Sequence, residues 1–189
     1  MNTVTRIIDC YFRHVKGCFT MPDVRIPMRD FCRSADLMAY NVNTKEQFHV
    51  ENAVTHSQLW SFSADNLYEL FDKSFLGLSG TRKGKDATPV KEGKCFKNIQ
   101  RAYRSLGFSS AKVKRIFVVW CIKPGVSVKM VSNAYYKKHG IRVEVLSFRD
   151  QILSDLERKV LGHIFHYDDV LRMLSLIALR GIQTRDARS

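Results

Sequence analysis

Several features that would assign a chain to a large protein class are absent from this sequence of 189 residues. It contains no run of about 18 or more apolar residues, so we expect no membrane-spanning helix. Its first fifteen residues interrupt their apolar positions with Arg6, Asp9 and Arg13, which is unlike a signal peptide. The five cysteines are odd in number and form no CxxC pair, so neither a disulfide framework nor a zinc site is indicated. Together these absences predict a cytoplasmic protein that makes no use of a membrane.

Motifs of common catalytic sites are missing as well. The sequence has no GxxxxGK[ST] phosphate-binding loop and no GxSxG nucleophile elbow. The short basic segment GTRKGK lacks the strand-to-helix context that a phosphate-binding loop requires. Neither nucleotide hydrolysis by such a loop nor serine hydrolysis of the elbow type is therefore indicated.

Positive charge, by contrast, is abundant and concentrated. The chain has 31 Lys and Arg against 18 Asp and Glu, a formal net charge of +13. The segment 82–115 holds eleven basic residues and two acidic ones, a surplus of nine. Such a concentration is typical of a protein that binds a polyanion, although a solvated basic face that aids solubility would give the same count. The cations that we expect to contact nucleic acid are Lys83, Lys85, Lys91, Lys94, Lys97, Arg101 and Arg104.

The spacing of apolar residues predicts an alternation of helices and strands. Strands are expected at 35–41, 47–54, 115–122 and 141–148. Helices are expected at 3–16, 64–76, 91–106 and 127–139, with a further one from 149 and a last one at 167–179. The segment 21–33 contains two prolines and is expected to be an extended connection, and 76–93 a loop.

This order of elements predicts a single α/β domain. The strands 35–41 and 47–54 form an antiparallel hairpin, whereas strand, helix and strand over 115–148 form a βαβ unit, whose strands are normally parallel. The fold class is therefore α/β, with a mixed central sheet of hairpin and βαβ unit, flanked by helices. We expect a core over 3–160, a C-terminal helix over 167–180 and a frayed tail over 184–189.

Each strand of the predicted hairpin carries one acid among apolar residues, Asp36 on the first and Glu51 on the second. If the strands pair across the turn, the two carboxylates can face the same way. Two carboxylates on one sheet face repel each other unless a cation lies between them, and oxygen ligands suit Mg²⁺ or Mn²⁺. The alternative is that both acids lie at strand ends in water. His49 shares the face of Glu51 and either binds a metal or phosphate or is a partly buried, hydrogen-bonded residue.

The order of elements, together with Asp36 and Glu51 fifteen residues apart, resembles the PD-(D/E)XK nuclease-like (restriction-endonuclease-like) superfamily over roughly residues 3–160. In that family an Asp on one strand and a Glu followed by x-Lys on the next bind the metal and activate water. The resemblance implies that Asp36 and Glu51 hold Mg²⁺ or Mn²⁺. It also suggests the backbone carbonyl near Asn52 and, by looser analogy, Asp9 of the first helix as further ligands.

The sequence departs from the family pattern in one place, because Ala53 stands where the family has its lysine. Members of the family sometimes supply that lysine from another element, and Lys91, Lys94 and Lys97 of the basic helix are candidate donors. Lys94 and Lys97 are therefore counted as catalytic residues together with the two acids. Equally, Ala53 is consistent with a chain that lost catalysis and kept binding.

The expected function is binding of nucleic acid, in the first place DNA, with metal-dependent cleavage of phosphodiesters as a DNA endonuclease if the site is active. The alternative is a catalytically inactive nuclease-fold subunit that binds DNA or docks on a protein partner. Dimerisation is common among nucleases that cut both strands, so the resemblance also makes a homodimer a candidate assembly.

Overall fold

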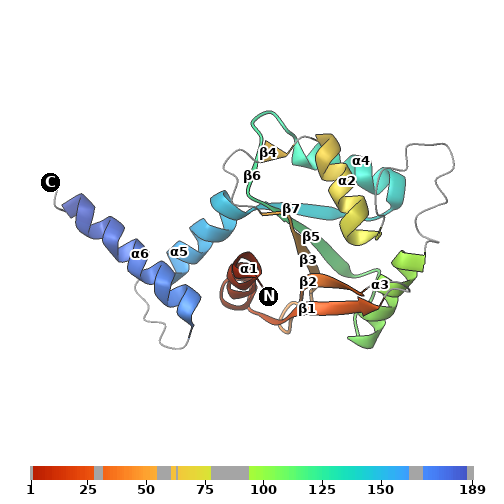
Figure 1. Cartoon of the computed structure of the whole chain (residues 1–189), viewed down its shortest axis with the longest axis horizontal. Coiled ribbons are helices and arrows are strands. Elements are labelled where there is room, and N and C mark those ends of the chain that lie inside the picture. The colour runs from red at the N-terminus through yellow and green to blue at the C-terminus, as the bar shows by residue number, and fades with distance from the viewer. Residues whose placement is uncertain are drawn as a thin grey trace.

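A five-stranded mixed sheet runs through the molecule (Figure 1). The computed structural model describes residues 2–27, 32–54, 61–62, 64–77, 94–161 and 168–186. The sheet order is β1 (Cys18–Pro27), β2 (Cys32–Asn41), β3 (Gln47–Asn52), β5 (Val113–Val119) and β7 (Val143–Ser147). The first three strands are antiparallel neighbours, whereas β3 with β5 and β5 with β7 are parallel. The predicted α/β class with a mixed sheet is confirmed.

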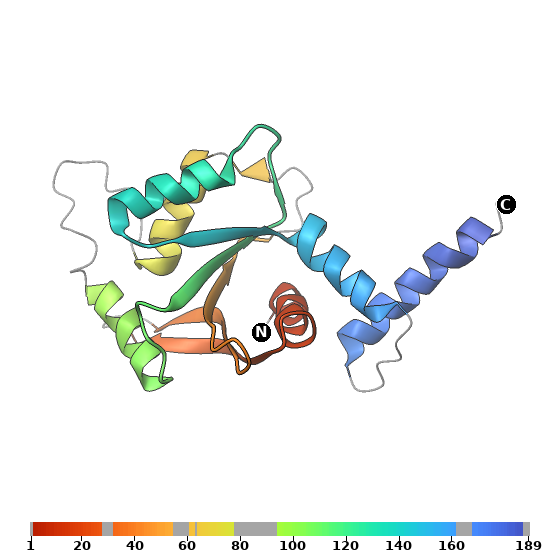
Figure 2. The same ribbon diagram turned by 180° about the vertical axis from the view of Figure 1, so that it is seen from behind.

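Helices cover both faces of this sheet, because its strands alternate apolar side chains between the two sides. On one face, α1 (Thr3–His14) buries Ile8 and Phe12 against a core that includes Leu37 and Val50. On the other face, α2 (Ala64–Phe75) and α4 (Val128–His139) pack over Phe117, and α3 (Lys94–Ser105) packs over the strands beside them. Figure 2 shows the sheet between α1 and α3.

The tight connection between β2 and β3 has a local cause. The side-chain oxygen of Asn41 accepts hydrogen bonds from the backbone amides of Asn43 and Thr44, and Lys45 takes a positive φ of 58°. Asn side chains favour such turns because they replace a backbone acceptor. The turn fixes the strand register, so that Met38 lies opposite His49 and Leu37 opposite Val50.

The C-terminal part of the chain extends away from the sheet. A π-helical segment over Phe148–Leu153 leads from β7 into α5 (Ser154–Val160), and α6 (Asp169–Asp186) follows. These helices form an arm to the left of the sheet in Figure 1. Leu171 of α6 is fully buried in the core shared with α1 and α5, so the arm is anchored at its base. None of the helices in the described part of the chain is both long and apolar enough to span a membrane.

The structure differs from the sequence prediction at several boundaries. The segment 21–33, expected to be an extended connection, contains most of β1, an edge strand that pairs with β2 although it includes Pro22 and Asp23, whose φ is 52°. The single strand expected over 115–122 is divided at Trp120 into β5 and β6 (Cys121–Ile122), which pairs with β4 (Ser61–Phe62). The tail expected to fray from residue 184 continues α6 as far as Asp186. Of the predicted loop 76–93, residues 78–93 lie outside the described residues.

Candidate functional site

Asp36 and Glu51 occupy matching positions on neighbouring strands. The last paired residues of the β2–β3 ladder are Leu37 and Val50, and Asp36 and Glu51 are the next residue on each strand. Residues that face each other across an antiparallel pair share a face of the sheet. The register alone would place the two acids on one face, but their hydrogen bonds lead to opposite sides of the sheet, Asp36 toward α1 and Glu51 toward α3. Glu51 is buried and Asp36 half-buried.

Glu51 forms one end of a buried chain of hydrogen bonds. Its Oε1 lies 2.8 Å from Nε2 of His49, and Nδ1 of the same ring lies 2.6 Å from the hydroxyl oxygen of Tyr103 in α3. The side chains of His49 and Tyr103 are fully buried, and the Phe75 ring meets the imidazole edge-on at 5.1 Å between centroids. Sequence reasoning left His49 open between a ligand and a buried, hydrogen-bonded residue, and the structure shows the second.

The donors and acceptors of this chain have one simple assignment. A carboxylate only accepts, so Nε2 of His49 donates to Glu51. The other nitrogen, Nδ1, can then accept a hydrogen bond from the Tyr103 hydroxyl, so both ring nitrogens have a partner of the right kind. The carboxylate thus selects the imidazole tautomer with its proton on Nε2, and the tyrosine hydroxyl satisfies the remaining ring nitrogen.

Asp36 belongs to a different set of hydrogen bonds. Its Oδ2 accepts from the backbone amide of Asn52 at 2.8 Å and from the Asn52 side-chain amide at 2.7 Å. The same side-chain amide lies 3.3 Å from the hydroxyl of Thr5 in α1, a residue that is 1% exposed. Asn52, which sequence reasoning made a ligand through its carbonyl, is seen here as a double donor that holds the Asp36 carboxylate in place.

The two carboxylates are therefore fixed from opposite sides of the sheet, Asp36 through Asn52 and Thr5 of α1 and Glu51 through His49 and Tyr103 of α3. Within the described ranges, no group of three or more His, Cys, Asp or Glu side chains lies together in a way that could hold a metal ion.

Ala53, which stands where the family has its lysine, packs against the core. Ala53 is half-buried against the core beneath α2 and α4, and its amide donates to the carbonyl of Val118 at 2.9 Å. Lys97, one of the candidate replacements, is exposed on α3, whereas the side chains of Lys91 and Lys94 lie outside the described part. The Glu51 carboxylate contacts His49.

A buried arginine that sequence reasoning counted only as surface charge lies beside this chain. Arg115 of β5 is paired in register with His49, and its side chain is 7% exposed. Its guanidinium donates to the carbonyls of Val113 at 3.2 Å and Ser110 at 3.3 Å and lies 5.8 Å from the Tyr103 ring centre. The sequence did not indicate that Arg115 is buried. The run RIFVV predicts a strand that is covered on both sides, and such a run does not show what the arginine contacts.

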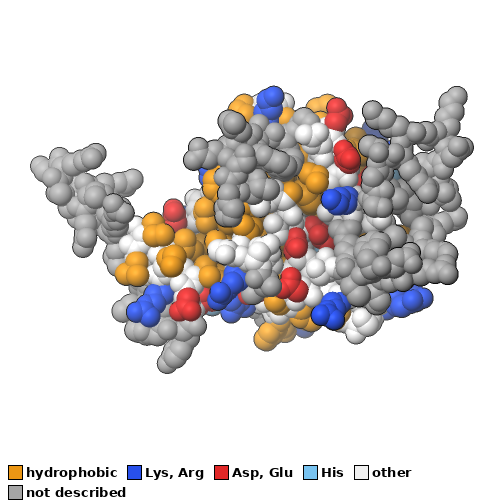
Figure 3. Space-filling model, viewed as in Figure 1, with side chains coloured by type: hydrophobic (Ala, Val, Ile, Leu, Met, Phe, Trp, Pro, Cys, Tyr) orange, Lys and Arg blue, Asp and Glu red, His pale blue; other side chains and the backbone are white. Residues whose placement is uncertain are grey.

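The outer face of α3 carries the positive charge that the sequence predicted for it. Lys97, Arg101 and Arg104 are exposed, whereas Phe96, Ile99, Ala102 and Tyr103 are buried beneath them. No ion pair joins these three cations to an acid among the described residues, unlike Lys114, which pairs with Glu46. Blue side chains lie at the lower right of Figure 3, where Figure 1 has α3. Lys83, Lys85 and Lys91 lie outside the described residues.

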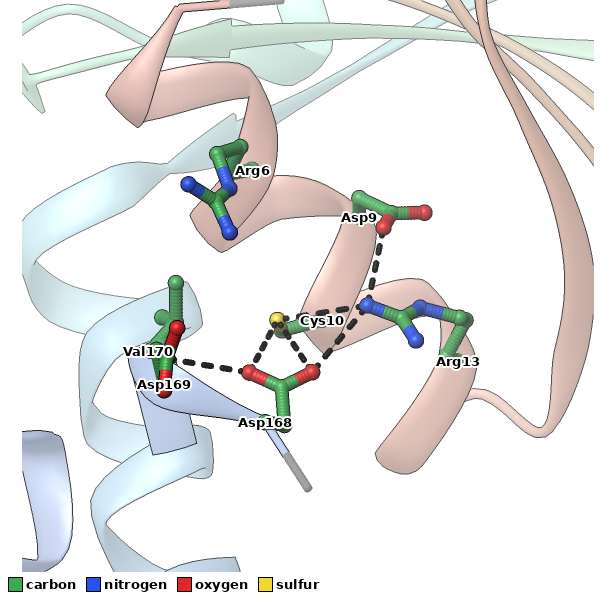
Figure 4. A pocket seen from close by; sticks show the side chains of 7 residues that line it. All are labelled: Arg6, Asp9, Cys10, Arg13, Asp168, Asp169 and Val170. Carbon is green, nitrogen blue, oxygen red and sulfur yellow. Dashed lines mark hydrogen bonds and ion pairs between the residues drawn. The ribbon is translucent and has the colours of Figure 1, made fainter. Parts of the chain in front are cut away.

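A second polar cluster lies between α1 and the start of α6, around a pocket of about 230 Å³ (Figure 4). Arg13 pairs with Asp9 at 3.0 Å and with Asp168 at 3.2 Å. Asp9, which was expected as a further metal ligand, is therefore neutralised by an arginine one helical turn away. Figure 4 shows Arg13 between the two carboxylates, so this cluster is an ion-pair network that fastens α6 to α1.

Burial and the charges of this network shift the pKa values of Cys10 and Asp168. Burial, reinforced by the charge of Asp168, raises the pKa of the Cys10 thiol to about 12. Burial opposes ionisation of Asp168, but hydrogen bonds from the amides of Leu171 and Val170, the Cys10 thiol and the charge of Arg13 outweigh it and lower the pKa of Asp168. Cys10 is thus a poor nucleophile, and Asp168 is a charged cap at the start of α6.

Comparison of the chain with protein-family models, with curated proteins and with solved structures gave no match.

Proposed function

We propose that this chain binds nucleic acid, in the first place duplex DNA, along the exposed face of α3. The observation that carries the proposal is the row of Lys97, Arg101 and Arg104, which have no acidic partners among the described residues and lie on a helix whose opposite face is buried. Residues three and four apart lie on one side of a helix, so the three charges form a single stripe. Neutralising phosphates releases condensed counterions, and this release favours binding of such a stripe to DNA.

The rigid packing of α3 against the sheet supports DNA binding more strongly than net charge alone does. Tyr103 and Ile99 are fully buried between α3 and the sheet, which fixes the direction in which the basic side chains leave the helix. A fixed stripe loses less conformational freedom on binding than charges on a loop would. This distinguishes α3 from the scattered lysines elsewhere on the surface.

The experiment measures the salt dependence of binding to a labelled DNA duplex of mixed sequence by fluorescence anisotropy. Replacing Lys97, Arg101 and Arg104 by Gln should make the slope of log K against log salt less steep by about 2.7, since each lost phosphate contact removes about 0.9. A matched control replaces three exposed lysines of equal charge around α4, namely Lys123, Lys129 and Lys137.

The control variant should keep most of the slope. Equal losses in the two triple variants would mean that net charge and not α3 attracts the duplex, and the proposal would then be wrong. Salt-independent binding, or none, would instead favour the alternative of a subunit that docks on a protein partner. The same titration with an RNA duplex decides between the two nucleic acids.

A second candidate function is hydrolysis of phosphodiesters with Mg²⁺ or Mn²⁺, favoured by the matching positions of Asp36 and Glu51 on β2 and β3. Mg²⁺ is commonly held by one or two carboxylates and keeps several waters, whereas within the described ranges no group of three or more His, Cys, Asp or Glu side chains is placed to hold an ion. When bound, the ion would polarise the phosphoryl group and lower the pKa of a water. Asp36 and Glu51 would hold it, while Arg101 and Arg104 would hold the phosphate backbone.

Calorimetric titration with Mn²⁺ tests this candidate. The unaltered chain should bind one ion, and both Asp36→Ala and Glu51→Ala should abolish that binding. If only one substitution matters, the site is not shared between the two strands. If the ion binds but no duplex is cleaved, the chain is better described by the inactive alternative that Ala53 favours.

A further inference from the structure

One row of side chains crosses the sheet on the face that α3 covers. Phe19 of β1 is paired with Tyr40 of β2, and Tyr40 is paired with Gln47 of β3. Gln47 is in turn paired with Val113 of β5. Residues directly opposite each other on neighbouring strands share a face of the sheet. Val113 and Tyr40 pack in the core beneath α3, so the side chain of Phe19 lies on that face as well.

The outer end of this row is open to solvent. Val113 is buried and Tyr40 half-buried, whereas Phe19 is 72% exposed. The ring of Tyr40 lies 6.3 Å from the ring of Phe108, which is buried just after the end of α3. Phe19 and Tyr40 are therefore neighbouring aromatic residues at the rim of the core, and we call this pair the aromatic platform.

Positive charge lies at the same end of the sheet as the aromatic platform. Lys45 belongs to the turn between β2 and β3, Lys112 directly precedes β5, and Arg104 lies in the last turn of α3. All three are exposed, and the described part of the chain gives none of them an acidic partner. Glu46, the acid of the same turn, is paired with Lys114. The surroundings of the platform therefore attract a polyanion.

We propose that the aromatic platform stacks on unpaired bases, so that the preferred ligand of this chain is duplex DNA with a single-stranded extension. The proposal rests on the proposed binding of DNA by α3 and names the form of DNA that would bind most tightly. Proteins that bind single strands combine cations along the backbone with aromatic side chains on which successive bases stack. Both components are present here within one end of the sheet.

The platform continues the basic stripe of α3. The stripe ends at Arg104, the Phe108 ring follows four residues later, and the platform lies beside that ring across β2 and β1. A strand that leaves the duplex near Arg104 would therefore meet Tyr40 first and Phe19 next.

The same charges argue against a second copy of the chain as the occupant of this surface. A symmetric contact through Phe19 would bring two identical sets of cations together, and like charges across an interface oppose association. A nucleic-acid strand instead supplies the phosphates that these cations lack, and its bases cover the exposed ring.

The test measures fluorescence anisotropy with two labelled DNAs at one salt concentration. One is a blunt duplex, and the other is the same duplex with a single-stranded thymidine extension of about ten nucleotides. Binding of the blunt duplex reports the function of α3, whereas the ratio of the two affinities reports the platform. The unaltered chain should bind the extended duplex about tenfold more tightly, and Phe19→Ala should bind the two DNAs with nearly equal affinity.

Two further substitutions separate base stacking from apolar contact. Phe19→Leu keeps a large apolar side chain without a π system, so it should lose the preference as Phe19→Ala does. Phe19→Trp keeps a stacking surface and should retain the preference, and its added tryptophan emission should be quenched by the extended duplex. The matched control is Tyr136→Ala, at an exposed aromatic residue of α4, which should leave the ratio of affinities unchanged.

The outcomes separate this proposal from the proposed function. If the unaltered chain binds the blunt and the extended duplex equally well, the platform is wrong while DNA binding by α3 stands. If it binds neither DNA, the two proposals fail together. A preference that survives in Phe19→Ala or Phe19→Leu would also overturn the platform. So would sedimentation in which Phe19→Ala converts a dimer into a monomer, because a second copy would then cover the ring.

Discussion

Replacing Asn52 by Ala tests whether this residue holds Asp36. The substitution removes the 2.7 Å hydrogen bond from the Asn52 side-chain amide to Oδ2 of Asp36 and the longer contact of 3.3 Å with Thr5. The backbone hydrogen bond from Asn52 to Asp36 remains. Hydrogen bonds to charged groups contribute about 1.5–3 kcal/mol, and half-burial of both residues favours the lower end, so we expect a loss of about 1.5 kcal/mol.

Urea unfolding followed by circular dichroism measures this loss as a change in midpoint at constant slope. For a chain of this size, about 1 kcal/mol corresponds to a shift of roughly 2–4 °C in Tm, so a thermal scan should show a decrease of roughly 3–6 °C. The matched control is Asn133→Ala, at an exposed position of α4, which should change stability by less than about 0.5 kcal/mol.

A double-mutant cycle with Asp36→Ala identifies the partner. If the side-chain amide acts on Asp36, the two losses should fail to add by more than about 0.5 kcal/mol, because either substitution alone removes the same contact. Strict additivity, or a loss no larger than that of Asn133→Ala, would refute the assigned role.

Three further predictions concern other parts of the chain. Cys10, whose pKa is raised to about 12, should react with iodoacetamide in the native protein far more slowly than the half-buried Cys121, as peptide mass spectrometry will report. Because the folded pKa of Asp168 is lowered below its ordinary 3.8, its stabilising effect is present above that pH and is lost as the pH falls through the folded value. Scans of Tm against pH should therefore show Asp168→Asn less stable than the unaltered chain at neutral pH, with the two curves converging in acid; parallel curves would contradict this. Finally, Ala53→Lys should lower stability, because Ala53 packs against the core beneath α2 and α4, yet raise Mn²⁺-dependent cleavage of duplex DNA if that lysine is what the site lacks. Cleavage unchanged by this substitution would show that Ala53 does not limit the site.

The sequence predicted the mixed sheet and the amphipathic α3 well, because both rest on local periodicity. The polar turn after Asn41 indicated the β2–β3 hairpin, and the spacing of Lys97, Arg101 and Arg104 indicated one exposed face. β1 was missed because prolines argue against a strand, although an edge strand tolerates them. The helical i,i+4 spacing of Asp9 and Arg13 could have indicated their ion pair before the structure did.

The contacts around the candidate site could not be predicted from the sequence, for a different reason. Tyr103 and His49 are 54 residues apart, and Arg13 and Asp168 are 155 apart. Sequence separations as large as these leave no recognisable pattern in a single sequence, because the fold and not the residue spacing brings such partners together. The sequence could therefore suggest Glu51 as a functional carboxylate but could not identify what orients it.

The strained backbone of β1 has a consequence for how copies of this chain can meet. An incoming strand would need a regular series of amide donors and carbonyl acceptors along the free edge of the sheet. Pro22 offers no amide hydrogen, and the positive φ of Asp23 turns the backbone out of the extended path at the next residue. A continuous sheet across two molecules would break there within a few residues. The β1 edge is therefore a poor surface for strand pairing between copies, whereas the exposed Met173, Leu176 and Ile177 of α6 form an apolar surface away from that edge.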